Sequence, residues 1–127
     1  MVSRPTRCVL VVEDDTLISS FVAEALSESG YAVRVAANGQ EALRELPWAP
    51  DLIMLDLGMP LLDGWGFRAE QRTNPATANI PVILMSALDN LEGHAELLDA
   101  QGILAKPFTL DGLLDVVENT FSSKTNR

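Results

Sequence analysis

Asp56 is the residue at which this sequence first suggests chemistry, because it is a carboxylate placed directly after an apolar run. The four large apolar residues 52–55 precede it without polar alternation, a pattern typical of a central parallel strand that is covered on both faces. The segment that follows contains the turn-forming residues Gly58, Pro60, Asp63 and Gly64. Ligands bind at the carboxyl ends of strands in such sheets. We therefore expect Asp56 to be a functional group rather than a loop cap.

Three other apolar runs also stop at polar residues. The run 8–12 is followed by Glu13, Asp14 and Asp15, the run 80–85 by Ser86, and the run 103–105 by Lys106. If these runs are parallel strands, their polar ends meet at one edge of the sheet. Carboxylates crowded together raise one another's pKa values, and a divalent cation relieves that repulsion. An all-oxygen set without nearby His or Cys favours Mg²⁺.

Ser86 and Lys106 extend this prediction from metal binding to phosphoryl chemistry. An ammonium and a hydroxyl that face a metal ion can neutralise and hold the oxygens of a phosphoryl group. Asp56 can then act as the nucleophile that accepts the group. The residues alone therefore predict phosphorylation on Asp56.

The elements that must position these residues alternate along the chain. Apolar runs predict strands at 8–12, 31–36, 52–55, 80–85 and 103–105, and helical spacing predicts helices at 16–29, 38–46, 65–72, 89–99 and 109–121. Five alternations predict the α/β class, with a five-stranded parallel sheet and helices on both faces. We expect the flavodoxin-like, doubly wound (βα)5 sandwich with strand order 2-1-3-4-5, whose switch point brings Asp14 beside Asp56.

Composition limits the function classes. With 127 residues, 47% of them hydrophobic, the chain fits one domain over 1–127, with a core at about 8–121 and loose polar ends. A net charge of −9 argues against nucleic acid or an anionic membrane as a direct partner. The single cysteine, Cys8, excludes an internal disulfide and fits a small buried side chain. No apolar run approaches the ~20 residues of a membrane span, so we expect a cytoplasmic protein.

Over about 8–121 the sequence resembles the receiver domain of two-component response regulators, of the chemotaxis-regulator type. The matching features are Glu13-Asp14, Asp56 in LDLGMP, Asp63-Gly64, Ser86-Ala87 and Lys106-Pro107-Phe108. The resemblance implies that Asp14, Asp56 and the backbone carbonyl of Gly58 bind Mg²⁺, and that Glu13 contributes through water. It places Ser86, Ala87 and Lys106 at the phosphoryl group, with Ser86 and Lys106 contacting its oxygens. It also implies a cis peptide bond before Pro107.

The sequence departs from the family pattern in three places. Ile103 stands three residues before the lysine, where receivers often carry a rotating Tyr or Phe. The segment from Ser86 to Lys106 is about two residues shorter than the usual pattern, so we expect a short fourth helix or an altered loop. Gly58 and Leu88 occupy positions that resemble the family's variable neighbours of the phosphorylation site, and the resemblance implies that they tune the lifetime of the phosphoryl group.

Several single residues have competing interpretations. Asp15 is expected to be a helix N-cap rather than a third metal ligand. His94, the only histidine, is expected to be solvated rather than functional. Trp65 and Phe67 are expected to pack against the sheet rather than form a partner surface. For Trp48, exposure in a rigid loop and packing over the core edge stay open.

The leading functional hypothesis is a signalling switch. A histidine kinase or a histidine phosphotransfer protein would donate phosphate to Asp56, and the altered surface would act on an unidentified protein partner. Self-association into a homodimer stays open. The alternative is a binding module with a receiver fold and no phosphorylation, which predicts a missing acceptor or lysine. A phosphatase or phosphotransferase like the haloacid dehalogenases ranks last, because Gly58 stands where those enzymes carry a second acid.

Overall fold

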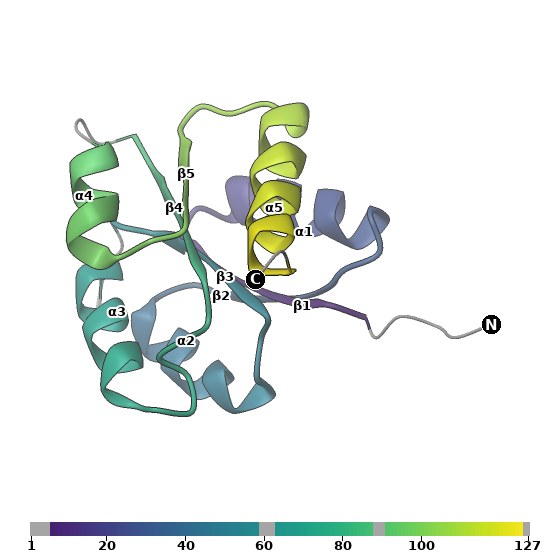
Figure 1. Cartoon of the computed structure of the whole chain (residues 1–127). Coiled ribbons are helices and arrows are strands. Elements are labelled where there is room, and N and C mark those ends of the chain that lie inside the picture. The colour runs from purple at the N-terminus through teal and green to yellow at the C-terminus, as the bar shows by residue number, and fades with distance from the viewer. Residues whose placement is uncertain (1–5, 59–62, 88–90, 126–127) are drawn as a thin grey trace.

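The computed structural model describes residues 6–58, 63–87 and 91–125, and these form a five-stranded parallel sheet with helices on both faces (Figure 1). The strands are β1 (Cys8–Val12), β2 (Ala32–Ala36), β3 (Leu52–Asp56), β4 (Val82–Ser86) and β5 (Gly102–Ala105). Their order is β2-β1-β3-β4-β5, which confirms the predicted flavodoxin-like topology. In the register, Val12 lies opposite Leu55, and Asp56 lies opposite Met85. The carboxyl ends of the central strands are therefore level with one another.

Two hydrophobic cores lie on opposite faces of the sheet. The helices are α1 (Thr16–Glu28), α2 (Gly39–Glu45), α3 (Gly64–Thr73), α4 (Leu91–Leu98) and α5 (Leu110–Thr125), with a 3-10 turn, η1 (Leu46–Trp48), after α2. One core joins α1 and α5 to the sheet, and the other joins α2, α3 and α4 to it. No helix in the described ranges is long and apolar enough to cross a membrane.

The predicted element boundaries are close to those observed. The second strand begins at Ala32 and the fourth at Val82, one and two residues later than expected, and α5 runs to Thr125 instead of 121. Asp15 is the N-cap of α1, and its Oδ1 accepts from the N–H groups of Leu17 and Ile18. The fourth helix is short, as expected, with eight residues; the predicted positions 89 and 90 lie outside the described residues.

The N-terminal half of α1 is more exposed than its apolar spacing suggested. Leu17 is 83% exposed and Phe21 44% exposed, whereas Val22 and Leu26 are fully buried. The helix turns about 100° per residue, so Leu17 and Phe21 lie beside the inward stripe rather than on it. The apolar pattern located the helix correctly but overestimated the width of its buried face.

Two aromatic side chains, Trp48 and Phe121, make contacts at the periphery of the fold. Trp48 is half-buried against the core under α2 and α3, and the guanidinium of Arg34 lies 4.7 Å from the centre of its ring. Phe121 on α5 stacks on Tyr31 with ring centres 5.7 Å apart, and the Arg7 guanidinium lies 4.3 Å from the Phe121 ring centre. Trp48 therefore covers the edge of the core, which was one of its two open interpretations. Phe67 is fully buried and Trp65 half-buried, as expected.

Candidate functional site

A cavity of about 310 Å³ opens at the carboxyl edge of the sheet. All seven residues that the sequence singled out line it, together with Asp15 and Ile18; the seven are Glu13, Asp14, Asp56, Gly58, Ser86, Ala87 and Lys106. They come from the ends of four different elements, β1, β3, β4 and β5. The alternation of strands and helices therefore places these residues together, as the topology predicted.

Three carboxylates form the acidic part of the cavity. Glu13 and Asp56 are 2% and 5% exposed, whereas Asp14 is exposed to solvent. Ligand oxygens of Glu13, Asp14 and Asp56 all lie within 4.8 Å of one another. Such an oxygen set with one open side suits a hard divalent ion that retains some of its water. The residues present therefore fit Mg²⁺.

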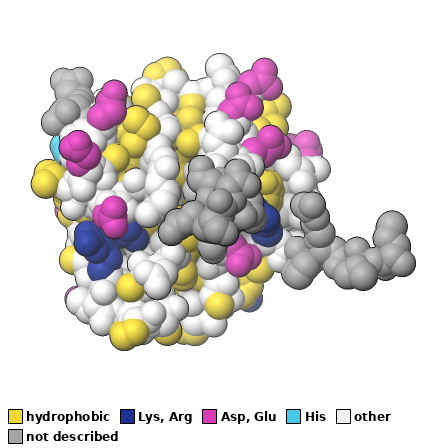
Figure 2. Space-filling view, in the orientation of Figure 1, with side chains coloured by type: hydrophobic (Ala, Val, Ile, Leu, Met, Phe, Trp, Pro, Cys, Tyr) yellow, Lys and Arg dark blue, Asp and Glu magenta, His cyan; other side chains and the backbone are white. Residues whose placement is uncertain are grey.

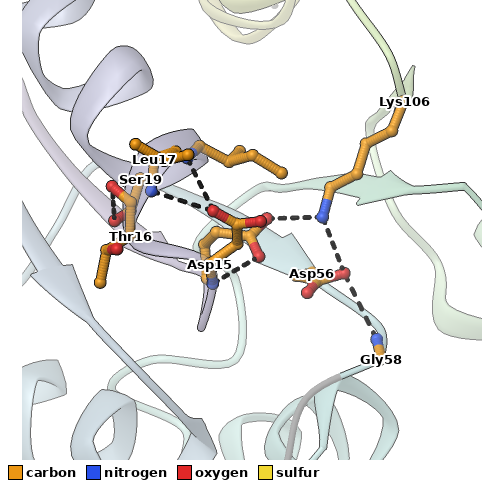
Figure 3. Close-up of polar contacts among 9 residues, drawn as sticks. Asp15, Thr16, Leu17, Ser19, Asp56, Gly58 and Lys106 are labelled. Atoms are coloured by element: carbon orange, nitrogen blue, oxygen red, sulfur yellow. Dashed lines mark hydrogen bonds and ion pairs between the residues drawn. The ribbon is translucent and has the colours of Figure 1, made fainter.

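Lys106 reaches into this acidic cluster (Figure 3). Its Nζ lies 2.7 Å from Oε1 of Glu13 and 3.5 Å from Oδ1 of Asp56. Burial alone would lower the pKa of Lys106, but its contact with Glu13 and the charge of Asp56 outweigh burial and raise it. The lysine is therefore a firmly charged ammonium that lies closer to Glu13 than to the predicted acceptor.

The pKa of the Glu13 carboxyl is strongly raised. Burial raises its pKa from 4.5 to about 7, and repulsion from Asp56 adds to this, although Lys106 and the N–H of Asp15 oppose it. Its buried Oε1 meets Lys106 at ion-pair distance but has no partner in hydrogen-bond geometry. An incompletely satisfied buried carboxylate oxygen is a further sign that the cavity can accommodate a cation.

The described residues on either side of the loop after β3 make close backbone contacts with one another. The N–H of Gly58 donates to Oδ1 of Asp56 over 3.3 Å, and the N–H of Gly64 donates to the carbonyl of Leu57. A Cβ atom at Gly64 would lie 2.5 Å from the carbonyl oxygen of Asp56, so only glycine fits there. Asp63 caps α3 by accepting from the N–H of Gly66. The Asp63-Gly64 pair therefore sets the path of the chain beside the acceptor.

The end of β5 is tied to the end of β4. The N–H of Lys106 donates to the carbonyl of Ser86 over 2.9 Å, and the Lys106–Pro107 peptide is cis, as the family resemblance implied. Ser86 itself is 3% exposed and lines the cavity. Ser86 and Lys106 are therefore neighbours in the lining of the cavity.

Two residues differ from their sequence interpretation. Ile18 lines the cavity although the sequence analysis did not assign it to the site; its position one turn after the acidic loop was the available signal. His94 is half-buried, not solvated, and its ring meets Trp65 edge-on with centres 5.1 Å apart. The prediction failed because the polar residues around His94 in sequence gave no sign of Trp65 on the neighbouring helix. His94 does not line the cavity.

Residues 9–118 match the family described as "Response regulator receiver domain". The chain belongs to this family. It is a receiver domain of two-component signalling systems, and phosphoacceptor signalling is the function of this group. The family is a signalling family, broadly non-enzymatic.

Individual relatives agree with this assignment. The probable chemotaxis protein CheY of Rhizobium etli is 31% identical over 119 residues, which are 91% of this chain and 92% of that protein. The DNA-binding dual master transcriptional regulator RpaA of Synechocystis is 36% identical over 84% of this chain. The solved structure of chemotaxis response regulator CheY4 of Vibrio cholerae has a TM-score of 0.85 and 29% identity, and the match covers 91% of this chain and 99% of that one.

The lengths of these relatives differ from the length of this chain. The matched region is 45% of RpaA and 51% of the probable transcriptional regulator ycf29 of Pyropia yezoensis. The chain therefore spans about half the length of several curated relatives.

Proposed function

We propose that Asp56 is the residue of this receiver that accepts the phosphoryl group. The observation that carries the proposal is the enclosure of the buried Asp56 carboxylate, with two further acids and an ammonium, in one cavity. In the transfer, a carboxylate oxygen of Asp56 attacks phosphorus, the P–N bond of a phosphohistidine breaks, and its electron pair stays on the imidazole. Lys106 and the Ser86 hydroxyl would neutralise the phosphoryl oxygens.

The reaction is proposed to depend on Mg²⁺. Asp14, Asp56 and the backbone carbonyl of Gly58 would hold the ion, and Glu13 would contribute through water. When bound, the ion would supply a Lewis acid that offsets the negative charge gathered at the phosphoryl group. The residues of the chain bind and orient the group and hold Lys106 in place. On this proposal the domain assists its own phosphorylation and dephosphorylation and is not a separate enzyme.

The donor is proposed to be a histidine kinase or a histidine phosphotransfer protein. Exposed apolar side chains lie near the cavity. Leu17 and Phe21 are on α1, the helix that contributes Ile18 to the cavity lining. Phe108, which follows Lys106 along the chain, lies next to Phe21, with the ring centres 6.2 Å apart. Acidic side chains lie over α5 on the face shown in Figure 2. A donor with an apolar contact and a basic surround fits this composition.

We further propose that residues 1–127 contain one receiver domain with its core at 8–121, that it acts in the cytoplasm, and that its output is a protein partner. Direct contact of this domain with nucleic acid or an anionic membrane is disfavoured by the net charge of −9. The alternative of a binding module without phosphorylation is not supported by any feature of the cavity, because both acceptor and lysine are present.

The test is intact-mass measurement after incubation with acetyl phosphate and Mg²⁺. The natural protein should gain one phosphoryl group, and Asp56→Asn or chelation of Mg²⁺ should abolish the gain. Asp63→Asn is the matched control, because that carboxylate is outside the cavity and asparagine can still cap α3. Undiminished labelling of the Asp56→Asn protein would contradict the assignment.

A further inference from the structure

Arg68 on α3 is a buried cation with an unusual set of partners. Its side chain is only 2% exposed, and it donates from Nε to the carbonyl of Leu98, from Nη2 to the carbonyl of Asp99 and from Nη1 to Oε1 of Gln71, over 2.8 to 2.9 Å. Burial, with repulsion from Arg72, lowers its pKa, and the charge of Asp99 opposes this. No carboxylate lies within ion-pair distance of Arg68 in the described ranges.

The two carbonyls that Arg68 binds belong to the end of α4. Leu98 is the last residue of that helix, and Asp99 follows it in the left-handed region with φ of 53°. The N–H of Asp99 donates to Glu96 and the N–H of Ala100 donates to Ala95, so the helix closes in a Schellman-type turn. The C-terminal carbonyls of a helix carry partial negative charge. Arg68 therefore supplies the cation that this helix end lacks within its own last turn.

Gln71 holds the guanidinium in this orientation. It is fully buried, and its Nε2 donates to the carbonyls of Thr77 and Ile80 while its Oε1 accepts from Arg68. Gln101 makes a second tie, because it donates to the carbonyl of Asp99 and accepts from the N–H of Val82. The end of α4 is thus fastened to α3 and to the start of β4.

The first turn of α4 is held differently. Leu91 is 5% exposed and packs in the core, and His94 meets the edge of Trp65. Within the described residues, the long-range polar bonds made by α4 and its closing turn, 91–101, all lie at the C-terminal end, at residues 98 to 101. The first turn is also the end that follows Ser86 along the chain. In the part of the chain that the structure describes, the polar ties between α4 and other elements therefore gather at the C-terminal end of the helix.

We propose that Arg68 is a positioning residue that holds the C-terminal end of α4 through its hydrogen bonds to the carbonyls of Leu98 and Asp99, an interaction called the pin below. A phosphoryl group on Asp56 then displaces the first turn of α4 and not its last. The pin does not depend on the proposed function, whereas the displacement of the first turn of α4 rests on that function. A buried ion is seldom the most stabilising choice, since an apolar side chain of similar volume often serves as well or better. A positioning role accounts for a guanidinium here, because its planar fork can bind two carbonyls at once.

The pin is tested without any phosphate mimic. Hydrogen exchange is measured residue by residue for the natural protein, for Arg68→Met and for the matched control Arg72→Met, whose arginine is exposed one turn further along α3. Arg68→Met should speed exchange at the amides of Asp99 and Ala100 by about tenfold or more, because it removes both charge-assisted hydrogen bonds to the carbonyls of Leu98 and Asp99, and Arg72→Met should not. The thermal midpoint should stay close to that of the natural protein.

Exchange at Asp99 and Ala100 that matches the Arg72→Met control would overturn the pin. A fall in thermal midpoint with uniformly faster exchange in every helix would also overturn it, because that result describes a merely structural residue. If Arg68→Met does not fold, Arg68→Lys serves instead. Its single ammonium cannot keep both carbonyl contacts, so it should raise exchange at the same two amides by a smaller factor.

The displacement is tested with beryllium fluoride and Mg²⁺. In the natural protein the mimic should change exchange in the first turn of α4, at 91–94, and leave Asp99 and Ala100 unchanged; in Arg68→Met the change should reach both ends. Equal changes at both ends in the natural protein would overturn the proposal. A mimic that leaves the Gly58 amide unaffected would instead contradict the proposed function, and the first experiment would still decide the pin.

Discussion

The ammonium of Lys106 lies closer to the carboxylate of Glu13 than to that of Asp56, and it interacts with the negative charge of both. The ammonium occupies the space between the two acids at 2.7 and 3.5 Å. A metal ion and Lys106 therefore compete for Glu13, while a phosphoryl group on Asp56 would offer the ammonium a stronger partner. We expect the lysine to change partners when Asp56 is phosphorylated.

Replacing Lys106 with methionine should separate these two roles. Mg²⁺ affinity should be unchanged or raised, because a positive charge beside the ion is removed, while the effect of phosphorylation on the rest of the domain should be lost. Titration with Mg²⁺ and hydrogen exchange with beryllium fluoride measure the two effects, and Lys106→Arg is the charge-preserving control. A loss of Mg²⁺ affinity comparable to that of Asp14→Ala would show that the lysine supports the metal site.

Glu13 should give the metal-free protein a characteristic pH dependence. Its pKa is raised from 4.5 to about 7 in the folded protein, so between these values the folded state binds a proton that the unfolded chain has released. The stability from this group is therefore complete below pH 4.5 and is lost as pH rises through 7. The free energy of unfolding, measured with denaturant across this range, should fall less for Glu13→Gln than for the natural protein. Parallel curves for the two proteins would refute the shift.

At the residue scale, the seven predicted site residues all line one cavity, whereas two surface assignments were wrong. Asp56 and Lys106 each follow an apolar run, so the topology alone brought them together. His94 and Leu17 were misjudged because their burial depends on what packs beside them. Trp65 meets His94 from another helix, and nothing covers most of Leu17. Local spacing carries no information about such neighbours.

At the scale of elements, the close approach of α3 to the loop after β3 makes Gly64 sensitive. Gly64→Ala would place a methyl 2.5 Å from the Asp56 carbonyl oxygen and 2.8 Å from the Leu57 Cα. Both neighbours are backbone, so the loop must shift, at a cost of roughly 1 to 3 kcal/mol. We expect lower stability, measured by denaturant unfolding, and slower labelling by acetyl phosphate.

Gly112→Ala is the control for that substitution. Its added methyl would meet only the Thr109 hydroxyl at 3.2 Å, on the first turn of α5. Alanine favours the helix there by up to about 1 kcal/mol, so this variant should be at least as stable as the natural protein. Equal losses in the two variants would mean that the tight packing at Gly64 is not the cause.

Substitutions on the buried face and on the exposed face of α1 should differ sharply in their effect on stability. Leu26→Ala removes a fully buried side chain and should cost about 2 to 5 kcal/mol. Leu17→Ala removes one that is 83% exposed and should change stability by less than about 0.5 kcal/mol. Denaturant unfolding of both variants measures this difference. A large loss for Leu17→Ala would show that the exposed stripe packs against something in solution.

Element types were largely predictable, whereas the ties between elements were not. Unalternating runs gave the strands, and Asp15 and Thr109 gave helix starts that the structure confirms by capping bonds. The buried Arg68 could not be foreseen, because an arginine in a polar helix ordinarily faces solvent. Its partners are backbone carbonyls about 30 residues away, and backbone groups leave no trace in side-chain patterns.

At the scale of the whole molecule, the parallel sheet separates two cores and leaves the site at the edge that both share. Helices α1 and α5 cover one face, and α2, α3 and α4 cover the other. Strand β3 is buried along its whole length, including Asp56. This architecture was predictable because five alternations of strand and helix leave few right-handed arrangements. A charge at the end of a doubly covered strand is thereby kept from bulk water on both sides.

The contact between Trp65 and His94 gives the molecule an optical property. Trp65 on α3 contacts the imidazole of His94 on α4, so the fluorescence emission of Trp65 would change when the packing between these two helices changes. The other tryptophan, Trp48, lies under Arg34 of β2, which is at the opposite edge of the sheet from β5. With Trp48 replaced by phenylalanine, the fluorescence of Trp65 alone would report changes at the contact between α3 and α4, without an attached dye.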